Sequence, residues 1–267
     1  MKILFFSFPP GLRRAAAGIL LLAALVAGGG WLWYAHRFAV WRAMAIYSVP
    51  TRERVVALTF DLSWGHNTPG PVLEVLKDYG LRVTFFLSGP WVKIHPEIAR
   101  RIAADGHEIG SHGYRHVNLS RLSPEAIRLE IMKAHRNILE VTGRAPRLLR
   151  TPNGDYDQKV VRVAEELGYR VIMWDTDSLD WKNPGVERIV SRVLKKAHPG
   201  DIILMHASDT CKQTAQALPL VIEGLQRQGY RIVTVSELLA LQEAPRPAPL
   251  RRDQEQKGWR ERPLPDA

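Results

Sequence analysis

The 267-residue chain contains a single cysteine, Cys211. One thiol can form neither an intrachain disulfide nor a zinc cluster of several thiolates, so neither of these can hold the fold together. The chain also has no Walker sequence, and no GxGxxG follows its first apolar strand. These two absences disfavour the nucleotide-binding versions of an open α/β sheet.

Positive charge is in excess, with 37 Lys and Arg residues against 27 Asp and Glu residues and a net charge of +10. Such a balance suits nucleic acid, anionic lipid headgroups or an acidic polymer such as a cell-wall glycan. Much of the excess lies at the two ends of the chain, and no basic stripe with interleaved aromatic residues occurs between them. We therefore predict no nucleic-acid partner.

One apolar run, residues 15–35, carries no charge, follows two arginines and ends in an aromatic belt. It is about long enough to cross the roughly 30 Å hydrocarbon layer of a bilayer as a helix. The run predicts a single-pass transmembrane signal-anchor in the cell membrane, with residues 1–14 in the cytoplasm and the folded domain outside. A cleavable signal peptide is the competing hypothesis, because residues 26–28 are small.

The remaining chain divides into three predicted parts. Residues 36–52 form a linker, residues 53–241 form the folded domain, and residues 242–267 form a Pro- and Arg-rich tail. The tail has too little apolar surface to bury, so we expect it to be disordered.

The folded domain repeats one pattern, in which an apolar strand is followed by an amphipathic segment of helical period. The predicted strands are residues 55–61, 83–88, 108–112, 148–151, 170–175, 201–206 and 231–235. The predicted helices are residues 69–79, 96–105, 124–142, 157–167, 186–197 and 215–228, followed by a short closing helix at residues 236–239. No hairpin signals interrupt the alternation, which predicts parallel strands in either a (β/α) barrel or an open doubly wound sheet.

Reactive side chains fall at or just beyond the ends of five predicted strands. These residues are Asp61, His112, Arg150, Asp175 and His206. Each one alone has a simpler explanation, such as a helix cap, a core histidine or a surface arginine. In a barrel the carboxyl ends of the strands meet at one mouth, so their common position favours the barrel and predicts a catalytic site there.

Two of these segments suggest particular chemistry. His112 and His116 lie four residues apart, a spacing common in divalent metal sites, although such a site usually needs a third, hard ligand and the pair could be ordinary polar histidines. The Arg150–Gly154 turn offers a fixed positive charge and backbone N–H groups that can face a developing oxyanion.

Five segments together resemble, in order, the motifs of the polysaccharide deacetylases, the NodB-homology domain of carbohydrate esterase family four. They are Thr59-Phe60-Asp61, Ser111-His112 through His116, Arg150-Thr151-Pro152-Asn153-Gly154, Asp177 through Trp181, and Ile203-Leu204-Met205-His206. The flanking residues are most similar to the membrane-anchored branch associated with sporulation. The resemblance implies an irregular (β/α) barrel of seven strands.

The resemblance also implies a role for each motif residue. It implies that Asp61 is the general base and His206 the general acid, with Arg150 holding the base and Asp180 orienting the histidine. His112 and His116 correspond to metal ligands, the backbone N–H of Asn153 to an oxyanion donor, and Trp181 and Leu204 to the walls of the substrate groove.

One departure from the family pattern concerns the metal. The family usually has a second Asp directly after the base as the third ligand, but this position is Leu62, which cannot ligate. A divalent ion such as zinc or cobalt would need another donor, for which Ser63, His66, Asp61 and water are the candidates. The family's Tyr in the third motif is also replaced, by Asn153, although its contribution there is through the backbone.

Three functions remain in competition. The first is an extracytoplasmic hydrolase that removes N-acetyl groups from an amino-sugar polymer such as peptidoglycan. The second is a glycan-binding envelope protein that has lost efficient chemistry together with the third ligand, as Leu62 suggests. The third is a hydrolase of small amides on the same barrel, because a fold does not fix its substrate.

Overall fold

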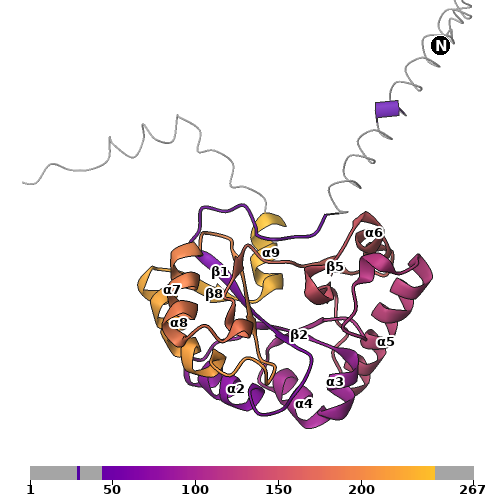
Figure 1. Cartoon of the computed structure of the whole chain (residues 1–267). Coiled ribbons are helices and arrows are strands. Elements are labelled where there is room, and N and C mark those ends of the chain that lie inside the picture. Colours follow the sequence, from indigo (N-terminus) through magenta and orange to yellow (C-terminus); the bar gives the residue numbers. More distant parts are fainter. Residues whose placement is uncertain (1–28, 31–43, 244–267) are drawn as a thin grey trace, which may run out of the picture.

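The computed structural model describes residues 29–30 and 44–243, and strands alternate with helices through most of this range (Figure 1). The strands are β1 (Val55–Leu62), β2 (Thr84–Leu87), β3 (Glu108–Ser111), β4 (Leu148–Leu149), β5 (Arg170–Val171), β6 (Thr176–Asp177), β7 (Ile202–His206) and β8 (Arg231–Val233). The helices are α2 (Pro69–Asp78), α3 (Gly89–Ile94), α4 (Pro96–Ala104), α5 (Pro124–Thr142), α6 (Gln158–Glu166), α7 (Val186–Lys196), α8 (Thr214–Arg227) and α9 (Val235–Glu243).

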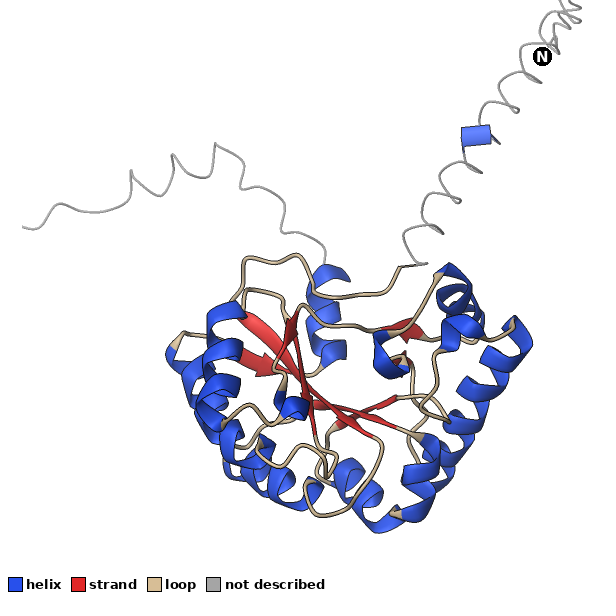
Figure 2. Cartoon of the chain, viewed as in Figure 1, coloured by secondary structure: helices blue, strands red, loops and turns tan. Residues whose placement is uncertain are grey.

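The strands form one curved, parallel sheet with β1 at its centre. The order is β5-β4-β3-β2-β1-β7-β6, and β8 pairs with the amino-terminal half of β1. Asp61 on β1 is in register with His206 on β7, so two residues that are far apart in sequence lie side by side. Figure 2 shows the strands in the middle of the domain and the helices around the outside. This arrangement is an open half-barrel.

Strand β1 is buried along its whole length because both of its faces are covered. Phe60 and Leu62 pack in the core under the outer helices, together with Leu73 and Leu218. On the opposite face the amino-terminal half of β1 packs against α9, whose apolar side chains fill the barrel interior at that end. The carboxyl ends of the strands are left open, which is where a (β/α) fold places its site.

The predicted parallel α/β architecture is confirmed, but the expected count of seven strands is wrong. The segment predicted as one strand, residues 170–175, keeps only its first two residues as β5, and a separate strand, β6, follows it at residues 176–177. The predicted strand ends early because Met173 hydrogen-bonds through its backbone N–H to Ile46 and through its carbonyl to Arg150, rather than to a neighbouring strand. Helix α3 was not predicted, and the other boundaries agree within a few residues.

Residues 46–49, within the predicted linker, form backbone bridges with the chain next to β5 and next to β7. Ile46 forms a parallel bridge with Ile172 beyond β5, and Ser48 forms an antiparallel bridge with Asp201 before β7. No helix in the described part of the chain is both long and apolar enough to span a bilayer. The predicted membrane segment, residues 15–35, lies outside the described residues apart from Gly29 and Gly30.

Candidate active site

A cavity of about 620 Å³ opens at the carboxyl ends of the strands. Seven of the nine predicted site residues line it, namely Asp61, His112, His116, Asn153, Trp181, Leu204 and His206. The other two, Arg150 and Asp180, are fully buried and hydrogen-bond to side chains that line the cavity. The structure therefore brings the predicted residues together, although their roles in a reaction stay predictions.

Asp175 does not join them, so its assignment to the mouth of the barrel is wrong. It lies before β6 rather than after a continuous strand, and its carboxylate is 3.4 Å from His198 Nε2. The break between β5 and β6 is the physical reason, because it places Asp175 at the amino end of the second short strand.

Asp61 is held by a buried cation. Arg150 Nη1 donates to Asp61 Oδ1 at 3.0 Å and to the Thr59 hydroxyl at 2.8 Å. The other guanidinium nitrogens donate to the carbonyl oxygens of Ile172 and Met173. These bonds fix Arg150 in a single orientation and leave Asp61 Oδ2 directed away from it.

Charge keeps the buried Asp61 ionised. Burial by itself raises the pKa of its carboxyl, but the positive charges of His112, when protonated, and of Arg150 outweigh burial and hold the pKa below 3.8. Burial also lowers the pKa of His112 to about 4, so that ring is neutral at pH 7. Arg150 is then the permanent cation beside Asp61, and the positive charge of His206, when protonated, lowers the Asp61 pKa further.

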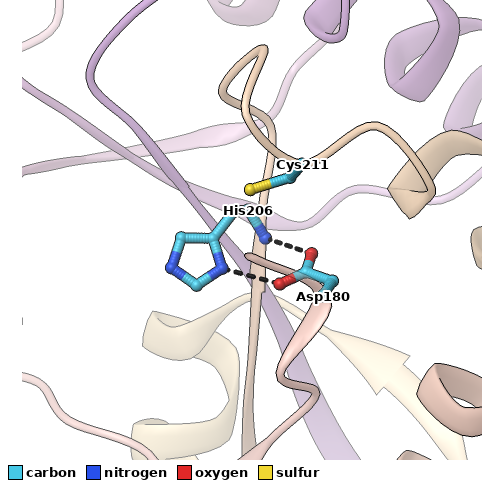
Figure 3. Close-up of side chains that lie close together, drawn as sticks. All are labelled: Asp180, His206 and Cys211. Atoms are coloured by element: carbon cyan, nitrogen blue, oxygen red, sulfur yellow. Dashed lines mark hydrogen bonds and ion pairs between the residues drawn. The ribbon is translucent and has the colours of Figure 1, made fainter. Parts of the chain in front are cut away.

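His206 has its own buried carboxylate partner (Figure 3). Its Nδ1 lies 2.7 Å from Asp180 Oδ1, and its backbone N–H donates to Asp180 Oδ2 at 2.8 Å. Thr214 donates a further hydrogen bond to Oδ2 at 2.7 Å. Because the carboxylate accepts from Nδ1–H, the imidazole presents Nε2 on the side away from Asp180.

The surroundings of His206 favour its protonated form. Burial lowers the pKa of the imidazole, but the hydrogen bond and charge of Asp180, together with the charges of Asp61 and Asp177, raise it above 6.5. Cys211 lies beside this pair in Figure 3, and burial raises the pKa of its thiol to about 12. The thiol is therefore neutral, and the three side chains are better described as a hydrogen-bonded pair with a thiol neighbour than as a metal site.

His112 and His116 offer donors that fit a divalent cation. His112 Nδ1 lies 2.9 Å from the Arg150 carbonyl, which can only accept, so Nδ1 carries the hydrogen and Nε2 has a free lone pair. His112 Nε2 is 3.6 Å from Asp61 Oδ2, and the ring centroids of His112 and His116 are 5.3 Å apart. Nε2 and the carboxylate oxygen both offer electron pairs and repel each other. A proton or a cation near both atoms removes this repulsion.

An apolar side chain, Leu62, occupies the position of the family's usual third metal ligand. Leu62 is fully buried in the core cluster and does not line the cavity. The hydroxyl of Ser63, which does line the cavity, is buried and has no hydrogen-bond partner among the described residues. Ser63 is therefore the best placed of the additional donors, whereas His66 is exposed and outside the cavity.

Sequence reasoning missed several residues of the site. Trp174, Ser208 and Thr210 line the cavity, and Thr214 contacts Asp180 from the first turn of α8. Ser208 and Thr210 lie within four residues of His206, so treating the whole loop after β7 as part of the site would have found them. The sequence around Thr214 gives no such indication, because its hydrogen bond to Asp180 depends on where α8 begins.

Comparison with known proteins agrees with this geometry. A family model described as polysaccharide deacetylase matches residues 48–172. A peptidoglycan-N-acetylglucosamine deacetylase of Bacillus cereus is 38% identical over 196 residues, which cover 72% of this chain and 92% of the relative. The peptidoglycan-N-acetylmuramic acid deacetylase PdaA of Bacillus subtilis is 32% identical over 199 residues, covering 73% and 75%.

One similar solved structure is that of a pseudoenzyme, in contrast to the two deacetylases above. The chain matches a carbohydrate esterase family four pseudoenzyme from Bacillus anthracis with a TM-score of 0.71 and 36% identity, covering 74% of this chain and 69% of that one. A mutant of the pseudoenzyme with restored enzymatic activity has also been solved.

Fold, cavity and relatives define a hydrolase that acts on carbon–nitrogen bonds other than peptide bonds, with a parallel α/β half-barrel as its scaffold. The chain belongs to the polysaccharide deacetylase family, the NodB-homology domain of carbohydrate esterase family four. Its class is polysaccharide N-deacetylase.

Replacing Asp180 tests the pairing with His206. The substitution Asp180→Asn removes the negative charge that raises the His206 pKa, so that pKa should fall, as expected for loss of a charged hydrogen-bond partner. NMR titration of the His206 ring measures the shift. Thr214→Val, which removes only a hydrogen bond to Asp180, should shift it less, and an unchanged pKa in Asp180→Asn would show that Asp180 does not set the protonation of His206.

Proposed function

We propose that this protein is an extracytoplasmic hydrolase that removes N-acetyl groups from the amino sugars of a cell-wall glycan, peptidoglycan or a related polymer. The observation that carries the proposal is the pairing of Asp61 and His206. They are in register on adjacent strands, line one cavity, and each has a separate buried partner of opposite charge. A base and an acid on one amide are what its hydrolysis requires.

In the proposed reaction Asp61 accepts a proton from a water molecule, whose oxygen attacks the acetamide carbonyl carbon. The backbone N–H of Asn153 donates to the developing oxyanion. His206, whose raised pKa favours the protonated form, gives its proton to the sugar nitrogen as the carbon–nitrogen bond breaks. Acetate and the free amine leave, and Asp61 and His206 exchange protons with solvent to return to their starting states.

A divalent metal such as zinc or cobalt, held by His112 and His116 with Ser63 as a further donor, would supply a Lewis acid beside the carbonyl and the water. The chain itself orients these donors. The Arg150 carbonyl fixes the His112 tautomer, and the Arg150 side chain fixes Asp61, so one residue positions both the base and a ligand.

The glycan substrate is supported by the names of the relatives, which act on peptidoglycan N-acetylglucosamine and N-acetylmuramic acid. The extracytoplasmic, membrane-anchored location is supported by the apolar run of residues 15–35. Both are expectations for this chain, as is a role in sporulation, which rests on the resemblance of its motifs.

A second function has two specific observations in its favour. Leu62 replaces the usual third ligand, and a relative with 36% identity is a pseudoenzyme. A glycan-binding envelope protein with weakened chemistry would keep the same cavity and still bind the polymer.

Acetate release separates the two functions. We expect the purified full chain, supplied with zinc or cobalt, to release acetate from N-acetylglucosamine oligomers or muropeptides. Asp61→Asn and His206→Ala should each reduce the rate by about 10²- to 10⁴-fold, the usual contribution of a general base or acid. Glu97→Gln, an exposed carboxylate outside the cavity, is the matched control and should leave the rate unchanged. Glycan binding without acetate release under any metal condition would instead identify a binding protein.

Metal binding is tested separately by spectroscopy. Cobalt added to the metal-free chain should produce visible absorption bands of a protein-bound ion, because imidazole nitrogens are good ligands for it. His112→Ala and His116→Ala should abolish the bands, and Ser63→Ala should weaken binding. His66→Ala is the matched histidine control, since His66 lies outside the cavity. Retention of the bands in both histidine variants would place the metal elsewhere.

A further inference from the structure

One buried carboxylate outside the cavity has no part in the chemistry described above. Glu130 lies on α5, and only 3% of its surface is exposed. It is not among the residues that line the cavity. A carboxylate is stable at such depth only when hydrogen bonds and an opposite charge compensate for the loss of water. The residue that supplies this compensation therefore shows what the carboxylate holds.

Two hydrogen bonds to Glu130 come from a single residue, Arg115. The Arg115 backbone N–H donates to Glu130 Oε2 at 2.7 Å, and Arg115 Nε donates to Oε1 at 2.7 Å. The Arg115 side chain is 61% exposed, so an ion pair alone could form at the surface without burying a carboxylate. Burial of Glu130 points instead to its contact with the backbone, which fixes the main chain at Arg115.

The main chain at Arg115 lies between the two candidate metal ligands. His112 is held separately, because it follows β3 directly and its Nδ1 bonds to the Arg150 carbonyl. His116 comes immediately after Arg115. In the described part of the chain, the two bonds to Glu130 are the hydrogen bonds that join residues 114–116 to another element.

The chain beyond the second histidine is tied to a different segment. Asn153 Nδ2 donates to Asn118 Oδ1 at 2.8 Å, and two hydrogen bonds from Ser120 end on the Asp155 carboxylate. These bonds begin two residues further along the chain. Glu130 is therefore the contact that acts next to the second histidine.

The position of the His116 ring depends on this backbone contact. The ring itself has edge-on contacts, with its centroid 5.3 Å from that of His112 and 5.1 Å from that of Trp64. A zinc ion needs each imidazole nitrogen at about 2.0–2.1 Å, so a small shift of the loop would separate one nitrogen from the ion. Because Leu62 supplies no third carboxylate, the site could not compensate for that loss.

We propose that Glu130 is a positioning residue for the metal donors. By fixing Arg115 from α5, it sets the place of the His116 ring and with it the affinity of the site for a divalent ion. Glu130 contacts neither the ion nor the substrate. The inference rests on the proposed function for the identity of the metal donors, but it concerns binding and is measured without turnover.

Zinc affinity of the metal-free full-length chain, measured by calorimetry, tests the inference. Glu130→Gln should weaken zinc binding by about tenfold, the lower end of the usual cost of losing a residue that orients a metal ligand. The reason is that one accepting oxygen becomes an NH₂ donor that faces an N–H of Arg115. Glu130→Ala should weaken it further, up to about 100-fold. Arg115→Ala should have a smaller effect than Glu130→Ala, because the backbone bond to Oε2 remains.

Cobalt spectra add a readout that a general loss of stability would not change. At saturating cobalt the visible bands of Glu130→Gln should differ from the wild-type bands in position or intensity, because the His116 nitrogen is displaced from the ion. Arg128→Ala is the matched control. It removes an exposed ion pair with Glu166 from the same helix and should leave the zinc affinity and the bands unchanged.

Wild-type affinity and bands in both Glu130 variants would overturn the inference. So would equal weakening by Arg128→Ala, because the stability of α5 would then set the affinity, and so would a wild-type chain that binds neither ion. Metal binding that depends on Glu130, without acetate release by the wild-type chain, would uphold the inference and reject the proposed hydrolysis. Acetate release together with a zinc affinity independent of Glu130 would do the reverse.

Discussion

The site depends on one buried guanidinium. Arg150 is fully buried, and an unpaired charge at that depth would cost several kcal/mol. It is compensated by Asp61, by the Thr59 hydroxyl, by two backbone carbonyls and by the Phe86 ring, which lies 4.2 Å from the guanidinium carbon. These partners come from β1, from β2 and from the chain just beyond β5. Arg150 thus joins the floor of the cavity to the core and fixes the charge of the base.

His206 on one side of this centre and the pair His112 and His116 on the other differ in how completely their hydrogen bonds are satisfied. His206 has a fully hydrogen-bonded carboxylate partner, so its orientation and charge are defined by the protein alone. The metal side has two imidazoles, an unpartnered serine hydroxyl and a leucine in the usual ligand position. In the proposed reaction, weaker binding of a metal would leave less Lewis-acid assistance and make the rate depend more on Asp61 and His206.

Much of this could be predicted from local sequence, and what could not has a physical reason. Asp61, His112, Arg150 and His206 follow apolar strands, so parallel topology alone predicts that they meet. The interruption of the predicted strand at residues 170–175 depends on hydrogen bonds between Met173 and two residues that are distant in sequence, since Met173 donates to the Ile46 carbonyl and accepts from Arg150. The hydrogen bond from Trp64 Nε1 to the Thr210 hydroxyl has no signal in the local sequence, because it depends on how two loops meet.

The coupling between Asp61 and Arg150 is the most direct test of this account. Unfolding free energies of Asp61→Asn, Arg150→Met and the double variant, measured by denaturant at pH 7, give their interaction energy. We predict a favourable coupling of about 1–3 kcal/mol, because each single substitution leaves its partner buried without compensation. Since the Asp61 pKa is lowered in the folded state, the coupling should be complete above pH 3.8 and decrease as the pH falls below it. Additive effects, with no coupling at pH 7, would contradict the claim that Arg150 holds the base.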